Sequence, residues 1–391
     1  MTLPLKKLNN KMKKEILVLF LSLFLIQNSI ENQNKKLKKN LFDETKVKKL
    51  LLKNRLIRGA VGDYCLFKEG HLTDEALKLY NQLSDNGVSL LYTGATLMTE
   101  NSVNQFNIFK FDKDEYIEEY KKLTNIVHKN NAYIIMQLAE IGLKMESGKE
   151  NYYSPSAVKN PFFDVISKEV SKEQILQIEN DFVNTALRAK KSNFDGIDIH
   201  SAHLNLLSQF LSPEFNKRND EYGGNDENRA RFLIEIIKKI RKAVGEDFII
   251  SLKLNSYDGD KFKNGITESG FLTTCKLAES AGVDIIQVSG DWDQKKPKPK
   301  NPMFLDITKK LSDIVKIPVV LIGGIRDVET MENILNTSNI EYFGIVRPLI
   351  CEPDIVKRWL NGDRSKAKCI TCNSCLRNDG ECALNKKNKN L

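Results

Sequence analysis

The sequence predicts an α/β fold, a parallel eight-stranded (β/α)8 TIM barrel, and three observations support this prediction. Short β-branched runs alternate with amphipathic helical segments from residue 50 onward, which is typical of a parallel sheet with helical crossovers. Eight of these runs have the length of strands, and polar side chains follow several of them, where barrel enzymes carry their chemistry. The strands are expected at residues 55–60, 88–93, 133–138, 196–200, 248–254, 285–289, 318–323 and 342–346.

Helices are expected between these strands. Residues 172–191 are the clearest case, because Ser171 and Gln174 have the spacing of a capping box and Ile175, Ile178 and Phe182 share one face. A second, basic helix is expected over residues 228–243. Its position after a polar, glycine-containing loop fits a crossover between the fourth and fifth strands.

The composition is that of a globular protein, and its charge is concentrated at the ends. The chain has 391 residues, of which 41% are hydrophobic, so one barrel would fill most of it. The net charge is +9, but residues 1–40 carry nine lysines and two acidic residues. Lys386, Lys387 and Lys389 add positive charge at the carboxyl terminus, and residues 41–385 are nearly neutral. Since no basic groove with interleaved aromatic residues is present, no nucleic acid partner is expected.

Residues 1–40 form a lysine-rich leader. Five lysines precede an apolar run at residues 16–26, which resembles a signal peptide or a short anchor. This run is about half of the roughly 20 residues that a transmembrane helix needs, so no membrane span is expected. An over-called start or an extension is the alternative. The expected organisation is the leader at 1–40, the barrel at 41–365 and a cysteine-rich tail at 366–391.

The ends of the predicted strands carry the residues that are suited to catalysis or binding. The fourth strand runs into His200 and His203, two of only four histidines in the chain. The third ends near Gln137 and the fifth contains Lys253. Paired imidazoles at the end of a strand suit a catalytic site better than a core.

The last two strands carry the elements of a phosphate site. The seventh runs into Gly323 and Gly324, followed by Arg326, and the eighth ends at Arg347. Glycines let backbone amides approach a phosphate, and an arginine can clamp its oxygens. Barrels commonly bind phosphate after strands seven and eight.

Five segments in this order resemble the old yellow enzyme family, the FMN-dependent NADH:flavin oxidoreductases. The segments are LKNRLIRGA, IIMQLAE, FDGIDIHSAHLNLLSQFLSPEFNKRNDEYGGNDENRARF, VVLIGGIRD and IVRPLICEPD. The resemblance runs from about Leu41 to Cys382 and implies a single barrel with FMN at its mouth. A cytoplasmic location is the family expectation, and export or membrane association through residues 1–40 is the alternative.

The resemblance implies a role for each strand-end residue. His200 and His203 would donate hydrogen bonds to the oxygen of a substrate carbonyl lying on the flavin. Gln137 would contact the edge of the flavin ring, and Lys253 would lie near its N1 and O2 atoms. The remaining cofactor contacts would come from the backbone of Ala60 and Val61 and from a phosphate clamp made of Gly323, Gly324 and Arg347.

The chain departs from the family pattern at several positions. Asn205 stands where the family usually has the tyrosine that protonates the substrate, and an amide cannot act as the acid. Glu140 replaces a histidine, Leu204 replaces a glycine, and Gly62 stands where a side-chain donor often tunes the flavin. These changes predict a reshaped cavity and a different source of the proton.

The seven cysteines are unevenly spread. Cys65, Cys275 and Cys351 are isolated and are expected to be small buried side chains. The tail cysteines Cys369, Cys372, Cys375 and Cys382 have spacings of two, two and six residues. Larger two-domain relatives of the family bind a four-iron cluster there with wider spacing. No metal is predicted, because no second redox domain follows; iron-sulfur or zinc binding is the alternative to a tail of reduced thiols.

The sequence therefore predicts an FMN enzyme that takes hydride from NADH or NADPH and reduces an activated alkene, a quinone or a similar electrophile. One alternative is a flavin-binding barrel with a sensing or partner-binding role and little turnover. Another is an iron-sulfur flavoprotein dehydrogenase of the dienoyl-CoA reductase or trimethylamine dehydrogenase type. The partners expected are the electrophile and the nicotinamide, and an oligomer is possible without being indicated.

Overall fold

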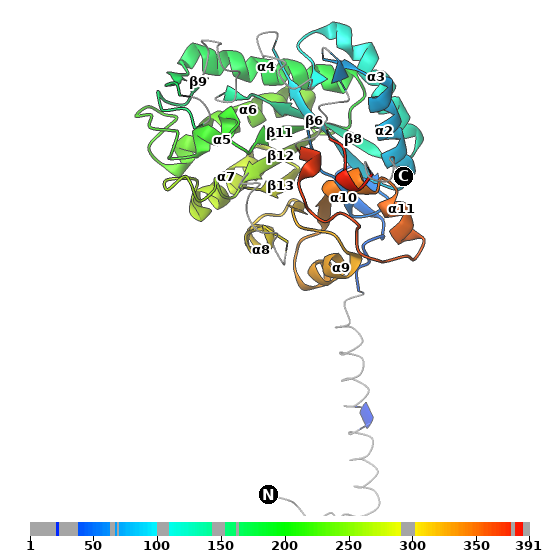
Figure 1. Ribbon diagram of the computed structural model, residues 1–391. Coiled ribbons are helices and arrows are strands. Elements are labelled where there is room, and N and C mark those ends of the chain that lie inside the picture. The colour runs from blue at the N-terminus through cyan, green and yellow to red at the C-terminus, as the bar shows by residue number, and fades with distance from the viewer. Residues whose placement is uncertain are drawn as a thin grey trace, which may run out of the picture. The chain divides into compact units, whose positions relative to one another are not determined.

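Eight parallel strands close into a barrel in this computed structural model (Figure 1). Because β3 pairs with both β15 and β6, the sheet has no free edge between them. The predicted fold class and all eight predicted strands are confirmed. In chain order the barrel strands are β3 (Leu56–Arg58), β6 (Leu90–Leu97), β8 (Tyr133–Ala139), β11 (Gly196–Ser201), β12 (Ile249–Asn255), β13 (Ile285–Ser289), β14 (Val319–Ile322) and β15 (Tyr342–Ile345).

The structure describes residues 21–22, 38–62, 67–68, 70–99, 109–142, 153–161, 164–290, 302–376 and 380–385. From Leu41 onward the chain forms one compact unit, and Met1–Asn40 is a separate unit. Most of the apolar run at 16–26, together with Cys65 and the terminal lysines, lies outside the described residues. Within the described ranges, no helix is long and apolar enough to cross a membrane.

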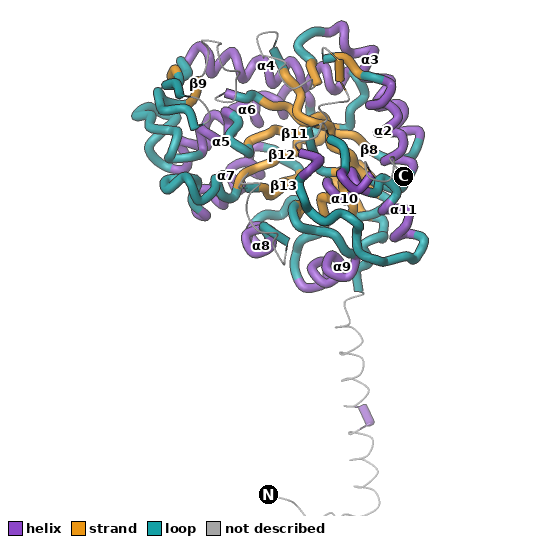
Figure 2. Tube along the Cα trace, in the orientation of Figure 1, coloured by secondary structure: helices purple, strands orange, loops and turns teal. Residues whose placement is uncertain are grey.

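Helices surround the strands, which lie at the centre of the tube view (Figure 2). Each presents an apolar face to the sheet, and the polar face stays in water. The outer helices are α2 (Asp74–Asp85), α3 (Ile117–Lys129), α4 (Lys172–Lys191), α6 (Asp226–Val244), α7 (Glu268–Ala281), α8 (Leu305–Ile314), α9 (Val328–Thr337) and α11 (Ile355–Leu360).

Two of these helices test the sequence reading directly. Helix α4 has the predicted bounds and the predicted capping box, in which Ser171 and Gln174 satisfy each other's backbone amides. Helix α6 begins two residues before the predicted start, at Asp226. The reason is that the side chain of Asn225 accepts a hydrogen bond from the Asn228 amide at 2.8 Å and so caps the helix earlier.

Short elements complete the fold. Strand β6 extends beyond its predicted end and pairs there with β7 (Phe109–Lys110). Near the ends of the barrel strands lie α5 (Leu206–Leu211) and α10 (Arg347–Cys351). The others are β4 (Phe67–Lys68), β5 (His71–Leu72), β9 (Tyr153–Ser154), β10 (Lys168–Glu169) and the 3-10 turns Asp114–Tyr116 and Ser374–Leu376.

A hairpin covers the amino end of the barrel. It is made of β1 (Thr45–Val47) and β2 (Leu50–Leu52), and its buried Val47, Leu50 and Leu52 join the cluster formed by the lowest inward residues of the strands. Fully burying such side chains stabilises the fold by roughly 1.5–3 kcal/mol each. The amino end is therefore packed with apolar side chains, which leaves the carboxyl end for chemistry.

Candidate active site at the carboxyl end of the barrel

The two histidines lie together at the carboxyl end of β11. Their ring centroids are 5.2 Å apart and the rings are almost perpendicular, at 86°. His200 is the buried, inward residue of the strand, and it stands beside Lys253 in the register of β11 with β12. The predicted imidazole pair and the predicted lysine are thus neighbours, although they are far apart in the sequence.

His203 is held by the two strands that follow. Its φ of 56° and the φ of 58° at Leu204 are left-handed, which costs an L-residue roughly 1–2 kcal/mol. The side-chain oxygen of Asn255, the last residue of β12, accepts a hydrogen bond from the His203 amide at 3.1 Å. The His203 Nε2 atom lies 2.8 Å from the hydroxyl of Ser289, the last residue of β13. These contacts hold the ring in place against the backbone strain.

A polar network fills the barrel interior below the histidines. At its centre is the fully buried carboxylate of Asp198, which shares the inward face of β11 with His200. Its Oδ2 atom accepts from Gln137 Nε2 at 2.7 Å. Its Oδ1 atom accepts from the Ser251 hydroxyl at 2.7 Å and from Gln287 Nε2 at 3.0 Å.

The donors around Asp198 indicate that its carboxyl group is charged. Burial raises the pKa of Asp198, while its three hydrogen bonds and the charge of Lys253 oppose this effect. Burial likewise lowers the pKa of Lys253, and the charge of Asp198 opposes it. We take both groups as ionised, because Gln137 and Gln287 each donate an amide N–H to one of the two carboxyl oxygens, and such donors favour the charged form. Lys253 Nζ also donates to the Ala60 carbonyl at 3.4 Å, which joins β12 to the end of β3.

The predicted phosphate residues lie at the ends of the neighbouring strands β14 and β15. Gly323 and Gly324 have φ of 96° and 78°, and a Cβ on Gly323 would lie 3.3 Å from the ring of Phe304. A residue with a side chain would therefore be strained there. Arg347 begins α10, directly after β15. The glycine pair and the arginine thus come from adjacent strand ends.

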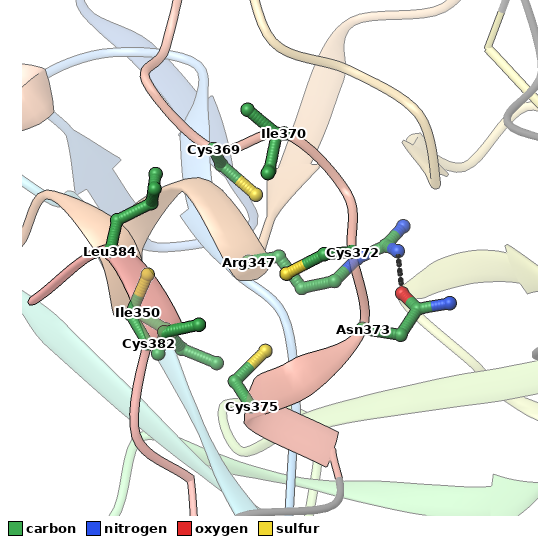
Figure 3. A pocket seen from close by; sticks show the side chains of 10 residues that line it. Arg347, Ile350, Cys369, Ile370, Cys372, Asn373, Cys375, Cys382 and Leu384 are labelled. Atoms are coloured by element: carbon green, nitrogen blue, oxygen red, sulfur yellow. Dashed lines mark hydrogen bonds between the residues drawn. The ribbon is translucent and has the colours of Figure 1, made fainter. Parts of the chain in front are cut away.

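The four tail cysteines line one pocket with Arg347 (Figure 3). Cys369, Cys372 and Cys375 come from one continuous segment, and Cys382 comes from the following segment. Among the described residues, no three His, Cys, Asp or Glu side chains converge closely enough to hold a single metal ion. Four thiols around one cavity are nevertheless the donor set of a four-iron cluster, whose iron atoms are held by one cysteine each.

Asn205 and Leu204, two of the departures from the family pattern, are buried. Asn205 is the N-cap residue of α5, but its side chain does not accept a hydrogen bond from the first turn of that helix. Leu204 packs with Phe215, and the partly buried Val158 and Phe262 lie against them. The isobutyl group of Leu204 thus helps to build an apolar cluster next to His203.

Glu140, the third departure, is buried at the end of β8. Its carboxyl oxygen accepts a hydrogen bond from the Tyr153 hydroxyl at 2.9 Å, and its carbonyl accepts from the Leu206 amide at 2.8 Å. Burial raises the pKa of Glu140, and the hydrogen bond from Tyr153 opposes this effect. Glu140 therefore ties the strand end to α5 and β9 and is not part of the interior network around Asp198.

Comparison with known proteins identifies the family. Residues 40–365 match the NADH:flavin oxidoreductase / NADH oxidase family. The chain belongs to this family. It is 30% identical over 346 residues to an NADH oxidase of Thermoanaerobacter brockii, covering 85% of this chain and 53% of that protein. It is also 30% identical over 320 residues to an NADPH dehydrogenase of Clostridium acetobutylicum, covering 81% and 93%. The chain therefore spans about half the length of some family members and nearly all of others.

Solved structures agree with this assignment. An old yellow enzyme from Pichia sp. AKU4542 is 27% identical with a TM-score of 0.69, covering 83% of this chain and 87% of that one. A complex of 2-naphthoyl-CoA reductase has the same fold, with a TM-score of 0.78 and 23% identity, covering 86% of this chain and 54% of that one. The resemblance to the old yellow enzyme family is thereby confirmed.

The sequence pattern indicates four polar residues of the site but not the residues that support them. His200, His203, Gln137 and Lys253 lie where the strand ends predicted, and their individual roles stay predictions. The residues not anticipated are Tyr92, Asp198, Ser251, Asn255, Gln287 and Ser289. One signal was available, because Asp198 is an acidic residue on the inward face of an otherwise apolar strand, two positions before His200.

The left-handed backbone at Leu204 leads to a stability prediction. Leu204→Ala should lose about 2–3 kcal/mol of unfolding free energy, because it empties the apolar cluster and keeps the strained backbone. Leu204→Gly removes the same side chain but relieves the strain, so it should be more stable than Leu204→Ala by about 1 kcal/mol. Urea unfolding of the two variants gives the order, and an alanine variant more stable than the glycine variant would contradict this account.

The buried carboxyl of Glu140 leads to a pH prediction. Because its pKa is raised in the folded protein, the stability it contributes is fully present below the unfolded value near 4.5 and is lost as pH rises through the folded pKa. Glu140→Gln should therefore gain stability relative to the native chain as pH rises from 4 to 8. Unfolding measured across this range checks the sign. Tyr153→Phe removes a donor to the Glu140 carboxylate, so the loss of stability should occur at higher pH in this variant. An unchanged pH dependence would count against the hydrogen bond.

Proposed function

We propose that this chain is an FMN-dependent oxidoreductase that takes hydride from NADH or NADPH and reduces an activated alkene, a quinone or a similar electrophile. The observation that carries the proposal is the meeting of His200, His203 and Lys253 at the carboxyl end of the barrel. Membership of the NADH:flavin oxidoreductase family supports it.

The residues at this end fit FMN. Lys253 offers a buried positive charge, and Gln137 is a buried amide fixed by Asp198. Gly323 and Gly324 place no side chain at the strand end, and Arg347 offers a guanidinium for a phosphate. When bound there, FMN would accept a hydride from the nicotinamide and deliver it to the electrophile. The backbone of Ala60 and Val61 would line the cofactor from the end of β3.

The imidazoles would act on the electrophile. His200 and His203 would each donate a hydrogen bond to its carbonyl or quinone oxygen, where negative charge develops as the hydride arrives. Ser289 and Asn255 hold His203 for this role, so little reorganisation is needed at the moment of reaction. Mutagenesis of single donors of this kind elsewhere costs about 100- to 1000-fold in rate.

The proton must come from another source than in the usual family pattern. Asn205 carries no titratable proton, and Glu140 is turned to Tyr153 and not to the interior network. We infer that solvent protonates the alkene carbon that does not receive the hydride. The cysteine pocket enters no step of this reaction, and whether it stays metal-free, as the sequence reading expects, is a separate question that iron and sulfide analysis would answer.

The first test is spectroscopic. The purified full chain should be yellow or become yellow with added FMN, and NADH or NADPH without oxygen should bleach it. Re-oxidation by enones, quinones or nitro compounds then identifies the electrophile. A colourless protein that fails to take up FMN would contradict the proposal.

Histidine variants then separate turnover from flavin binding. In His200→Ala with His203→Ala, reduction of the electrophile should fall at least 100-fold while FMN remains bound. Phenol binding, which uses the same donors, should be lost with it. A double variant that keeps full turnover would show that the imidazole pair does not act on the substrate.

The opposite charges of Lys253 and Asp198 below the site predict opposite shifts in the flavin potential. Lys253→Met removes the positive charge that favours the reduced, anionic flavin, so the midpoint potential should fall by about 30 mV or more, equivalent to about 1.4 kcal/mol. Asp198→Asn removes the compensating negative charge, so the potential should rise. Dye-coupled anaerobic titration measures both. Shifts of the same sign would show that packing and not charge sets the potential.

A further inference from the structure

The turn that carries three of the cysteines contacts both halves of the predicted phosphate site. We call residues 369–376 the cysteine loop. Arg326, which follows the glycine pair after β14, donates from Nη1 to the Cys369 carbonyl at 3.3 Å, and its own carbonyl accepts from the Ala367 amide at 2.9 Å. Arg347, after β15, donates from Nη1 to the side-chain oxygen of Asn373 at 2.5 Å (Figure 3).

Within the part of the chain that the structure describes, the contact at Arg347 leaves the Nε and Nη2 donors of its guanidinium available. An arginine has five N–H donors in a planar fork, and Asn373 uses the Nη1 group only. A phosphate clamp needs two parallel donors. Asn373 can therefore fix the orientation of the fork without competing for the donors that a phosphate would take.

The backbone of the cysteine loop suits this role. Asn373 has a φ of 59°, and asparagine tolerates this left-handed conformation better than most residues. Thr371 has a φ of 58°, which is uncommon for a β-branched residue. A loop with two such residues is shaped by its contacts, and the hydrogen bonds to Arg326 and Arg347 are among these.

The charge of Arg347 also reaches the thiols. Burial raises the pKa of Cys375, and the nearby Arg347 guanidinium opposes this effect. Arg347 lines the cysteine pocket directly, together with the four cysteines. One arginine is thus shared between the pocket and the predicted phosphate clamp.

We propose that Asn373 is a positioning residue that orients Arg347 for the flavin phosphate, so that the cysteine pocket and FMN binding are energetically coupled. This inference rests on the proposed FMN site. Binding energy is reciprocal, so a loop held in this conformation strengthens FMN binding, and bound FMN stabilises the loop. The coupling acts through the phosphate and not through the ring.

Comparing FMN with riboflavin, which lacks the phosphate, makes this coupling measurable. FMN and riboflavin are titrated against the flavin-free full chain, following flavin fluorescence. Asn373→Gly removes the acceptor and keeps a residue that accepts the left-handed backbone. This variant should bind FMN about 5- to 10-fold more weakly, since Arg347 must then be immobilised at the moment of binding. Riboflavin, which has no phosphate, should bind the variant and the native chain equally.

A second glycine variant in the same loop is the matched control. Thr371→Gly also relaxes a left-handed position but leaves the Arg347 contact in place, so its FMN affinity should equal that of the native chain. Equal FMN affinity in Asn373→Gly and the native chain would overturn the inference, and so would equal weakening in both variants. A native chain that binds neither flavin would instead refute the proposed function.

Thiol labelling tests the reverse direction. Cys372 is exposed, so iodoacetamide can reach it. Saturating FMN should slow its alkylation several-fold in the reduced, metal-free chain, and riboflavin should not. In Asn373→Gly this protection should disappear. Protection by both flavins, or unchanged protection in the variant, would show that Arg347 does not transmit the effect.

Discussion

The buried carboxylate of Asp198 is the interaction on which the inside of the barrel depends. A lone charge at that depth would be costly, so the surrounding strands must supply donors and a counter-ion. They do so from three different strands, through Gln137 on β8, Ser251 and Lys253 on β12, and Gln287 on β13. Tyr92 extends the network by donating to the Ser251 hydroxyl at 3.1 Å. The orientation of these side chains follows from satisfying one acid.

The imidazole pair is likewise supported by hydrogen bonds from neighbouring strands. His203 adopts a strained backbone and is held by Asn255 and Ser289, each the last residue of the next strands around the barrel. Strain at one strand end is offset by hydrogen bonds from its neighbours. This explains how a leucine can occupy position 204 with a left-handed backbone. Its side chain is buried in an apolar cluster with Phe215 and offsets part of the backbone cost.

The sequence predicted what depends on local pattern. Strand number, the bounds of α4 and the strand-end placement of His200 and Lys253 follow from periodicity, capping and parallel topology. It could not predict the partners of Asp198, because these lie on other strands and their meeting requires the register of the closed sheet. The link from Arg347 to Asn373 was also out of reach. It joins a helix start to a cysteine-rich turn whose left-handed residues give no periodic signal.

The hydrogen bond from Gln137 to Asp198 has a consequence for ligand selection. Because the amide nitrogen of Gln137 donates to Asp198, the carbonyl oxygen is the atom of this amide left to accept a hydrogen bond from a ligand. At this position the site therefore offers a hydrogen-bond acceptor. Rotating the Gln137 amide would not change this without placing its oxygen against the Asp198 carboxylate. A heterocycle that presents an imide N–H there is matched, and one that presents only lone pairs meets repulsion. In the proposed flavin site, Asp198 would thus act through Gln137 to favour rings that present an N–H group.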